Sequence, residues 1–288
     1  MSPAAGTNPI RNVSDTALWV AIYRAMESER PDALFKDPYA RRLGGPRGEE
    51  IVRHMPNGAS MAWPMIVRTV VMDELINRCI ARGARTVLNL AAGLDTRPWR
   101  MTLPASLRWI HVDMPDMVDY MKEQMAGEQV RCRLEFAAAD LREEAARREI
   151  FARAAAEGPV LVITEGLLVY LTAEQVGALA RELHDVARAS WWISDLASPM
   201  LLKFLEKKWQ SRLQQGNAPM QFAPAEGTAF FAPFGWRELE FRSTWEDAMR
   251  LKRTMKGAWF WHLLSVFSTK KRREEGRRMS GSILLESV

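Results

Sequence analysis

Hydrophobic residues in the middle of the chain gather in short runs, and polar or small residues separate these runs. Five runs have the length expected of strands, at residues 86–90, 108–112, 133–138, 160–164 and 191–195. The fourth, Val160-Leu161-Val162-Ile163-Thr164, is apolar almost throughout, as in a strand covered on both faces. Helical segments are predicted between the runs: one at about 116–126, one that ends at 156, and one at 173–189 with Thr172 as its N-cap. This alternation predicts a parallel sheet with right-handed crossovers.

The flanking segments follow other patterns. Before the alternation, helices are predicted from Asp15, from Asp37 until Gly44-Gly45-Pro46, and over about 64–82. After it, residues 196–234 interrupt the pattern, with one helix near 200–214. A strand at 235–242, a helix from 245 to 256 or beyond, and a last strand at 282–287 complete seven strands.

We therefore expect an α/β fold in which a Rossmann-like, mostly parallel seven-stranded sheet carries helices on both faces. Residues 1–14 are expected to form a flexible tail, and 15–288 a single domain. Within that domain we expect a helical cap (15–82), a cofactor-binding core (83–195), a substrate-side insertion (196–234) and C-terminal strands with a helix (235–288).

Composition narrows the class of protein. A chain of 288 residues with 48% hydrophobic and 26% charged residues can bury a large core. Only two cysteines are present, so we expect neither a disulfide framework nor a metal site. No apolar run has the length of a membrane span and no signal peptide is recognisable, which favours a cytoplasmic protein without membrane contact.

The net charge of +5 is partly local, because a basic run occupies residues 270–278. Glu274 and Glu275 interrupt this run, which favours a solvated loop or helix end over a nucleic-acid site. No nucleic-acid partner is expected.

The most informative segment follows the first strand. Residues 87–97, VLNLAAGLDTR, form a strand and a small-residue turn, and Asp113 ends the next strand twenty positions after Gly93. In an open α/β sheet such a turn lets the backbone approach a nucleoside, and the carboxylate accepts hydrogen bonds from ribose hydroxyls. A dinucleotide site favours several glycines and a helix N-terminus at the pyrophosphate. Here Pro98 disfavours a helix start and Asp95 lies where an anion would pack, so S-adenosylmethionine fits better than a nicotinamide cofactor.

Carboxylates recur where the predicted strands end, at Asp95, Asp113, Asp140 and Glu165. Ligands of open α/β sheets bind at that edge. We expect Asp113 to bind the ribose, Asp140 and Leu141 to flank the adenine, and Glu165 with Gly166 to lie beside the methionine portion. The alternative is that these acids only end strands and cap helices.

Arginines supply the opposite charge. Arg68 lies in an apolar helical neighbourhood and could bind the methionine carboxylate, or form a structural ion pair with Asp73 or another acid. Arg24 lies in a similar helix and could also face the cofactor.

These motifs resemble the leucine carboxyl methyltransferase-like family of S-adenosylmethionine-dependent O-methyltransferases, which includes bacterial polyketide O-methyltransferases. The resemblance spans about residues 16–236 and rests on these segments: YRAME (23–27), FKDPYA (35–40), Arg68-Thr69, NLAAGLDTR (89–97), HVD (111–113), Asp140-Leu141, TEGLLVYL (164–171) and Gly235-Trp236. The cofactor-binding residues that it implies, together with the residues argued above, are Arg68, Ala91, Ala92, Gly93, Asp95, Asp113, Met114, Asp140, Leu141, Glu165 and Gly166. Ala91 departs from the glycine of many members.

The chemistry of methyl transfer requires alignment of an acceptor oxygen and exclusion of water. A carboxylate acceptor needs no base, whereas a phenol benefits from one. His111 is expected in the core and His184 on the surface, while His54 and His262 are not placed, so the catalytic residue stays open. The aromatic residues of the insertion favour a flat, apolar acceptor such as an aromatic polyketide, with Phe230 and Phe231 among the residues of interest.

The sequence thus predicts an O-methyltransferase that acts on a hydroxyl or carboxylate of a small acceptor and releases S-adenosylhomocysteine. The expected substrate-side residues are Tyr23, Arg24, Trp63, Tyr170 and Phe222. The alternatives are a non-catalytic binding or scaffold protein of the same fold and a nicotinamide-dependent oxidoreductase. The chain is expected to be a monomer or a homodimer.

Overall fold

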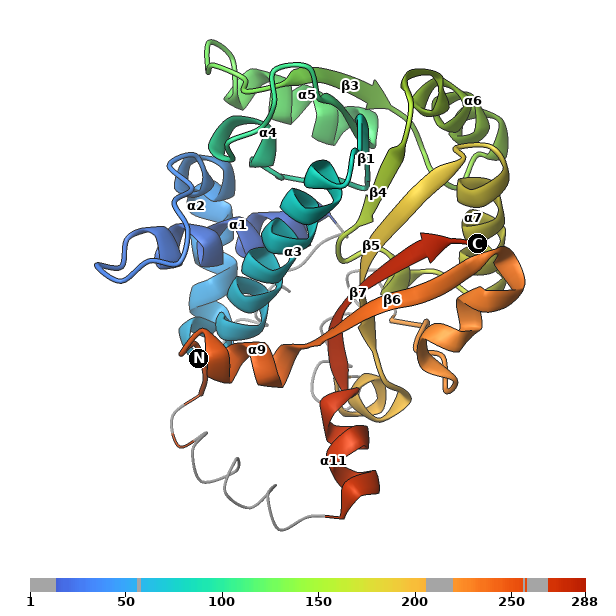
Figure 1. Cartoon of the computed structure of the whole chain (residues 1–288). Coiled ribbons are helices and arrows are strands. Elements are labelled where there is room, and N and C mark those ends of the chain that lie inside the picture. Colours follow the sequence, from blue (N-terminus) through green and yellow to red (C-terminus); the bar gives the residue numbers. More distant parts are fainter. Residues whose placement is uncertain (1–13, 56–57, 206–219, 256, 258–268) are drawn as a thin grey trace, which may run out of the picture.

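A seven-stranded sheet forms the centre of the molecule in the computed structural model (Figure 1). The structure describes residues 14–55, 58–205, 220–255, 257 and 269–288. The strands lie in the order β3-β2-β1-β4-β5-β7-β6. Neighbouring strands from β3 to β5 pair in parallel, whereas β7 pairs antiparallel with both β5 and β6. The predicted Rossmann-like, mostly parallel architecture is confirmed.

The strand positions agree with the hydrophobic runs. The strands are β1 (Thr86–Leu90), β2 (Arg108–Asp113), β3 (Arg133–Ala138), β4 (Val160–Thr164), β5 (Ala189–Ala197), β6 (Trp236–Ser243) and β7 (Ser280–Ser287). Every residue of β1 and β4 is buried, as their apolar sequences require. In register, Asn89 of β1 lies beside His111 of β2 and Ile163 of β4, so the carboxyl ends of these strands lie side by side.

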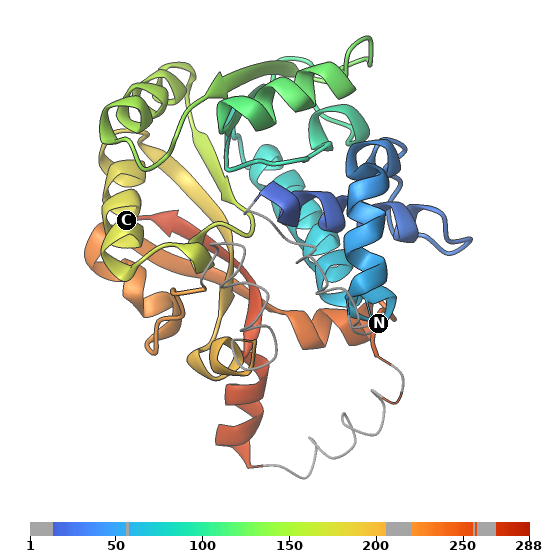
Figure 2. The same cartoon turned by 180° about the vertical axis from the view of Figure 1, so that it is seen from behind.

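Helices cover both faces of the sheet (Figure 2). The α-helices are α1 (Ser14–Ser28), α2 (Ala40–His54), α3 (Trp63–Ala81), α4 (Arg97–Arg100), α5 (Pro115–Gln124), α6 (Glu144–Ala154), α7 (Ala173–Asp185), α9 (Thr244–Arg250) and α11 (Lys270–Arg277). Short 3-10 turns occur at η1 (Gly58–Met61), η2 (Ala155–Glu157), η3 (Leu168–Tyr170) and η4 (Gly227–Phe234). Residues of α6 and α7 pack in one apolar core, and residues of α3 and α9 pack in another on the opposite face.

Several helix boundaries differ from the prediction. The helix that starts near Asp37 breaks at Gly45 as predicted, but a second helical segment follows the break, and the two together form α2 up to His54. Gly45 adopts φ 55° and ψ −173°, a conformation that glycine tolerates, and Pro46 begins the next turn. α9 ends at Arg250 rather than near 256, and Asp15 lies inside α1, which begins at Ser14.

The C-terminal part of the chain also differs from the prediction. The basic run forms α11, which lies at the start of β7 in Figure 1. The predicted helix near 200–214 is present over 199–205, and its remainder lies outside the described residues, as does most of the predicted tail. Thr172 caps α7 as predicted, and its side chain accepts from the Gln175 amide in a capping box.

Buried ion pairs attach the helical cap to the sheet domain. The fully buried Glu27 carboxylate of α1 accepts hydrogen bonds from the Arg253 guanidinium, which follows α9. Arg24 of α1 donates to Asp37 at 2.8 Å and to the Leu94 carbonyl oxygen at 2.5 Å. Because these charges would otherwise be buried without partners, they fix α1 against the turn that follows β1.

Candidate functional site

The turn between β1 and α4 has an unusual backbone. Ala91 has φ 49° and Gly93 has φ 52°, so both residues lie in the left-handed region. The Ala92 amide donates to the Val112 carbonyl oxygen of β2 at 3.0 Å, which holds the turn against the neighbouring strand. A Cβ on Gly93 would lie 3.3 Å from the Ala17 Cβ of α1. The absence of a side chain at Gly93 therefore lets α1 approach the turn.

Asp113 and His111 hold this turn from β2. The Asp113 carboxylate accepts hydrogen bonds from the Gly93 amide at 2.6 Å and the Met114 amide at 2.7 Å. The His111 Nε2 lies 3.2 Å from the Gly93 carbonyl oxygen, and since a carbonyl only accepts, Nε2 carries the proton. Burial lowers the pKa of His111, although the carboxylates of Asp95 and Asp113 oppose this effect. His111 is a core residue as predicted; its bond to the turn was not foreseen.

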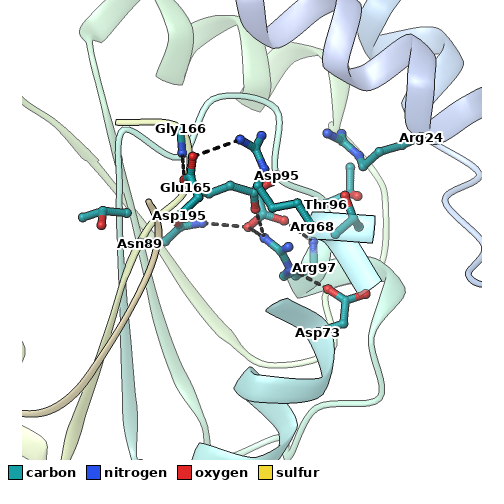
Figure 3. A network of polar contacts seen from close by, with 12 residues as sticks. Arg24, Arg68, Asp73, Asn89, Asp95, Thr96, Arg97, Glu165, Gly166 and Asp195 are labelled. Atoms are coloured by element: carbon teal, nitrogen blue, oxygen red, sulfur yellow. Dashed lines mark hydrogen bonds and ion pairs between the residues drawn. The ribbon is translucent and has the colours of Figure 1, made fainter. Parts of the chain in front are cut away.

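Arginine and acidic side chains converge beside the turn, as Figure 3 shows. The Arg68 Nε donates to Glu165 Oε1 at 3.0 Å, and the Arg97 Nη1 donates to Glu165 Oε2 at 2.9 Å. Arg97 also donates to Asp95 at 2.8 Å and, through Nε, to Asp73 at 2.7 Å. We call Arg68, Arg97, Asp95, Glu165 and Asp195 the arginine–carboxylate cluster.

Arg97 of α4 and Asp195 of β5 are the members of the cluster that were not among the predicted site residues. The Asp195 Oδ1 accepts from the Gly166 amide at 2.6 Å, and its Oδ2 lies 3.4 Å from the Arg68 Nη1. Asp195 lies at the end of the fifth predicted strand, so the rule that selected the four other acids would also have selected it. The structural partners of Arg68 are therefore Glu165 and Asp195; Asp73 pairs instead with Arg97 and Arg100.

The charge of the cluster is not balanced. Burial alone would raise the pKa of Glu165, but the guanidinium groups of Arg97 and Arg68 outweigh burial and lower its pKa to about 2. With two guanidinium groups facing three carboxylates, the cluster carries one excess negative charge. Such a site favours a ligand with one net positive charge.

Asp95 lies two residues before the short helix α4 that follows the turn. Its Oδ1 accepts from the Arg97 amide at 2.9 Å, and its Oδ2 accepts from the Asn89 side chain at 2.8 Å. The expectation that Pro98 prevents a helix here was wrong, because α4 forms with proline in its first turn, where no amide is needed. The expectation that a carboxylate fills the position of an anion agrees with the geometry.

Asp140 and Leu141 follow β3, next to the strand that carries Asp113. The Ala139 amide donates to the Asp113 carbonyl oxygen at 2.9 Å, so the two loops are adjacent. The Asp140 side chain pairs with the exposed Arg142, which lowers the pKa of Asp140. The structure brings this loop to the same edge of the sheet but gives Asp140 no contact with the arginine–carboxylate cluster.

Three of the predicted substrate-side residues are placed elsewhere. Tyr23 is buried inside the cap, where its hydroxyl donates to the Gly58 carbonyl oxygen at 2.7 Å. Trp63 packs edge-to-face on Trp245 of α9, with 6.5 Å between ring centroids. Phe222 is buried against Phe230. Their side chains serve the core, because packing and hydrogen-bond partners surround them.

Arg24 and Tyr170 lie closer to the cluster. Arg24 is paired with Asp37, yet its charge contributes to the low pKa of Glu165. Burial raises the pKa of the Tyr170 phenol, the Arg68 charge opposes this and the Asp195 charge adds to it, so the phenol lies near both. Of the predicted substrate-side set, Tyr170 is the aromatic residue that the structure places at the cluster.

Comparison with known proteins gives one family. The model of the leucine carboxyl methyltransferase family matches residues 17–184. A Frankia alni protein, provisionally named an S-adenosyl-L-methionine-dependent methyltransferase, is 33% identical over 257 residues, which cover 84% of this chain and 88% of that protein. A Streptomyces coelicolor protein with the same provisional name is 35% identical over 182 residues; these cover 59% of this chain and 64%, less than two thirds, of the relative.

Solved structures agree with the fold. A protein of the DUF574 family from Streptomyces avermitilis superposes with a TM-score of 0.59 at 13% identity, covering 93% of this chain and 97% of its own. A provisionally assigned methyltransferase from Thermobifida fusca gives 0.56 at 16% identity, with coverage of 97% and 96%. At these identities the likeness concerns the fold alone.

Proposed function

The chain belongs to the leucine carboxyl methyltransferase family and is an S-adenosylmethionine-dependent methyltransferase, and from this premise we propose that it methylates an oxygen of a small acceptor. The observation that carries the proposal is the arginine–carboxylate cluster with its excess negative charge beside the left-handed turn of Ala91 and Gly93. The name of the family supports oxygen, and in particular a carboxylate, as the acceptor.

The residues at this edge of the sheet fit the cofactor. S-adenosylmethionine carries a sulfonium, an ammonium and a carboxylate, so its net charge matches the excess negative charge of the cluster. Both Asp113 oxygens accept one backbone hydrogen bond each, and a carboxylate oxygen can accept a second from a ribose hydroxyl.

In this proposal Arg68 binds the methionine carboxylate and Glu165 with Gly166 lines the methionine portion. The turn of Ala91, Ala92 and Gly93 borders the amino-acid end, and Asp95 positions the turn. Further members of the proposed cofactor site are Asp113 and Met114 at the ribose and Asp140 with Leu141 at the adenine.

The bound cofactor supplies a methyl group on sulfur, and its transfer forms an oxygen–carbon bond as the carbon–sulfur bond breaks, leaving S-adenosylhomocysteine. The protein's part is to align the acceptor and exclude water. α1 covers the turn through Ala17, which supports a site closed to solvent on that side.

The histidines favour an acceptor that is already ionised. Of the three in the described part of the chain, His111 is buried behind the turn, His54 bonds the Glu50 carbonyl oxygen, and His184 pairs with Asp185. None of these side chains belongs to the arginine–carboxylate cluster, and a carboxylate acceptor needs no general base. We therefore favour a carboxylate over a phenol.

The aromatic residues of the insertion no longer support a flat acceptor. Phe222, Phe230 and Phe231 pack edge-to-face on one another, and Phe231 packs on Trp192 in the same way. We therefore do not favour an aromatic or polyketide-like acceptor, but the acceptor screen described below includes such compounds.

The two alternatives weighed from the sequence differ from a methyltransferase in testable ways. A nicotinamide-dependent oxidoreductase would need space for a pyrophosphate at the start of α4, where Asp95 accepts from the Arg97 amide. A non-catalytic scaffold protein of the same fold would bind the cofactor without transferring its methyl group.

The test has two steps. Calorimetry with S-adenosylhomocysteine should give micromolar binding, whereas NAD should give none. Incubation with methyl-labelled S-adenosylmethionine should then label small carboxylic acids in a screen that also contains phenols, including polyketide-like phenols, and peptides. Labelling of phenols alone would contradict the carboxylate proposal, and cofactor binding without turnover on any acceptor would support the scaffold function.

A further inference from the structure

Asp195 and Glu165 are neighbours on adjacent strands. β4 and β5 pair in parallel, and Thr164 lies beside Ser194. Glu165, which follows β4, and Asp195, the next residue of β5, therefore lie side by side at the same edge of the sheet. Arg68 of α3 contacts both carboxylates (Figure 3). The three side chains thus share one charged surface at the proposed amino-acid end of the cofactor.

The carboxylates of the cluster differ in the number of close hydrogen bonds that they accept. Each Glu165 oxygen accepts from a guanidinium, at 3.0 Å from Arg68 and 2.9 Å from Arg97. Asp95 accepts from Asn89 and from Arg97. One Asp195 oxygen accepts from the Gly166 amide, and within the described part of the chain its other oxygen has only the 3.4 Å contact with Arg68.

Exposure follows the same order. The Asp195 side chain is 27% exposed, compared with 18% for Glu165 and 10% for Asp95. A carboxylate that is open to solvent on one side and weakly paired is the one that an incoming cation can reach. Asp195 is therefore the member of the cluster that is best able to accept a new positively charged partner.

We propose that Asp195 is a specificity residue that binds the ammonium group of the cofactor's amino-acid end, while Arg68 binds its carboxylate. This inference rests on the proposed cofactor site and adds a residue to it. The long Arg68–Asp195 contact gives way when the two ends of the zwitterion bind, so each protein charge exchanges a weak partner for a closer one. The Gly166 amide holds Asp195 in place throughout.

The experiment compares three ligands by calorimetry. These are S-adenosylhomocysteine, its analogue without the α-amino group, and its analogue without the α-carboxylate. Asp195→Asn retains an oxygen for the Gly166 amide and removes the charge. It should weaken S-adenosylhomocysteine and the ligand without the carboxylate by about tenfold or more, the loss expected for a charge-assisted hydrogen bond. The affinity for the ligand without the amino group should not change.

Matched variants separate this role from a structural one. Asp119→Asn removes an exposed charge of α5 and should alter none of the three affinities. If Asp195→Asn does not fold, Asp195→Ser gives the same comparison with a smaller neutral side chain. Equal weakening of all three ligands, or no weakening of S-adenosylhomocysteine, would overturn the inference. Absence of S-adenosylhomocysteine binding to the wild-type chain would instead overturn the proposed cofactor site itself.

Discussion

The Asp113 carboxylate and the Gly93 amide nitrogen lie 2.6 Å apart, which joins the end of β2 to the turn that follows β1. The two residues are twenty positions apart in the chain. Since the His111 Nε2 binds the Gly93 carbonyl oxygen, β2 holds both the amide and the carbonyl group of Gly93. The shape of the proposed cofactor turn therefore depends on β2 as much as on the turn's own sequence.

Replacement of Asp113 tests this dependence. Asp113→Ala removes the acceptor for the Gly93 amide and the proposed acceptor for the ribose. We expect S-adenosylhomocysteine to bind at least ~10-fold more weakly, since about 1.5–3 kcal/mol of charge-assisted hydrogen bonding is lost. Calorimetry measures this loss, and Asp119→Ala on α5 serves as the control. Unchanged affinity in Asp113→Ala would place the ribose elsewhere.

Two glycine-to-alanine variants distinguish the effect of backbone strain on stability from the effect of the turn's shape on cofactor binding. Gly93→Ala and Gly127→Ala both place a Cβ on left-handed backbone, with φ 52° and 81°, and each should cost about 1–2 kcal/mol of stability. The Cβ at position 127 meets no atom within 4 Å, whereas the one at 93 meets Ala17 at 3.3 Å. We expect only Gly93→Ala to weaken S-adenosylhomocysteine binding. Urea unfolding and calorimetry give the two quantities, and equal affinities would contradict a role for this turn.

Glu165 contributes to stability through its charge. Its pKa of about 2 in the folded protein lies below the ordinary value of 4.5, so the stabilisation is complete above pH 4.5 and is lost as the pH falls toward 2. The difference corresponds to about 3 kcal/mol, which Glu165→Gln should remove at pH 7. Glu275→Gln on the exposed surface of α11 is the control. Equal unfolding free energies of Glu165→Gln and wild type would refute the ion-pair account.

His111 predicts a second, milder pH effect. Burial holds its folded pKa below 6.5, and its Nδ1 has no hydrogen-bond partner among the described residues. Below pH 6.5 the His111 imidazole therefore binds a proton more readily in the unfolded chain than in the folded one, so the stability of the folded protein falls as the pH drops. His111→Gln should reduce the slope of unfolding free energy against pH by up to about 1.4 kcal/mol per unit. An unchanged slope in His111→Gln would contradict this account.

Tyr23 distinguishes the cap core from the substrate side. Tyr23→Phe removes the hydrogen bond to the Gly58 carbonyl oxygen and should cost about 1 kcal/mol of stability. Because the ring is buried among cap residues, neither cofactor affinity nor turnover should change. Thermal unfolding and the labelling assay provide the comparison; a selective loss of turnover would return Tyr23 to the acceptor site.

The strands and the proposed nucleoside edge could be predicted because they depend on local pattern. The run Val160–Thr164 is apolar over the length of one buried strand, and Asp113 follows another such run. The break at Gly45 follows from the glycine–proline pair, but the helical segment after it could not be predicted, because tertiary packing stabilises that segment. At Gly44 and Gly48, which approach Leu18 and Ile22 of α1, such packing holds α2 in place.

The partners of the arginines were beyond sequence reasoning for a different reason. Arg68 is 97 positions from Glu165 and 127 from Asp195, and only the order of the strands brings them together. The positions of the aromatic residues were equally hidden, since Phe222 is buried against Phe230 whereas the Tyr170 phenol lies near Arg68 and Asp195. Asp195, in contrast, could have been found, because it ends a predicted strand as Glu165 follows one.

The order of the strands also has a consequence for the course of folding. The buried ion pair of Glu27 and Arg253 joins residues 226 positions apart, and β7 separates β5 from β6 in the sheet although β6 comes before it in the sequence. Contacts between distant residues form slowly, because a long loop of chain must close first. Until β7 is in place, β5 presents an open sheet edge that can pair with other chains.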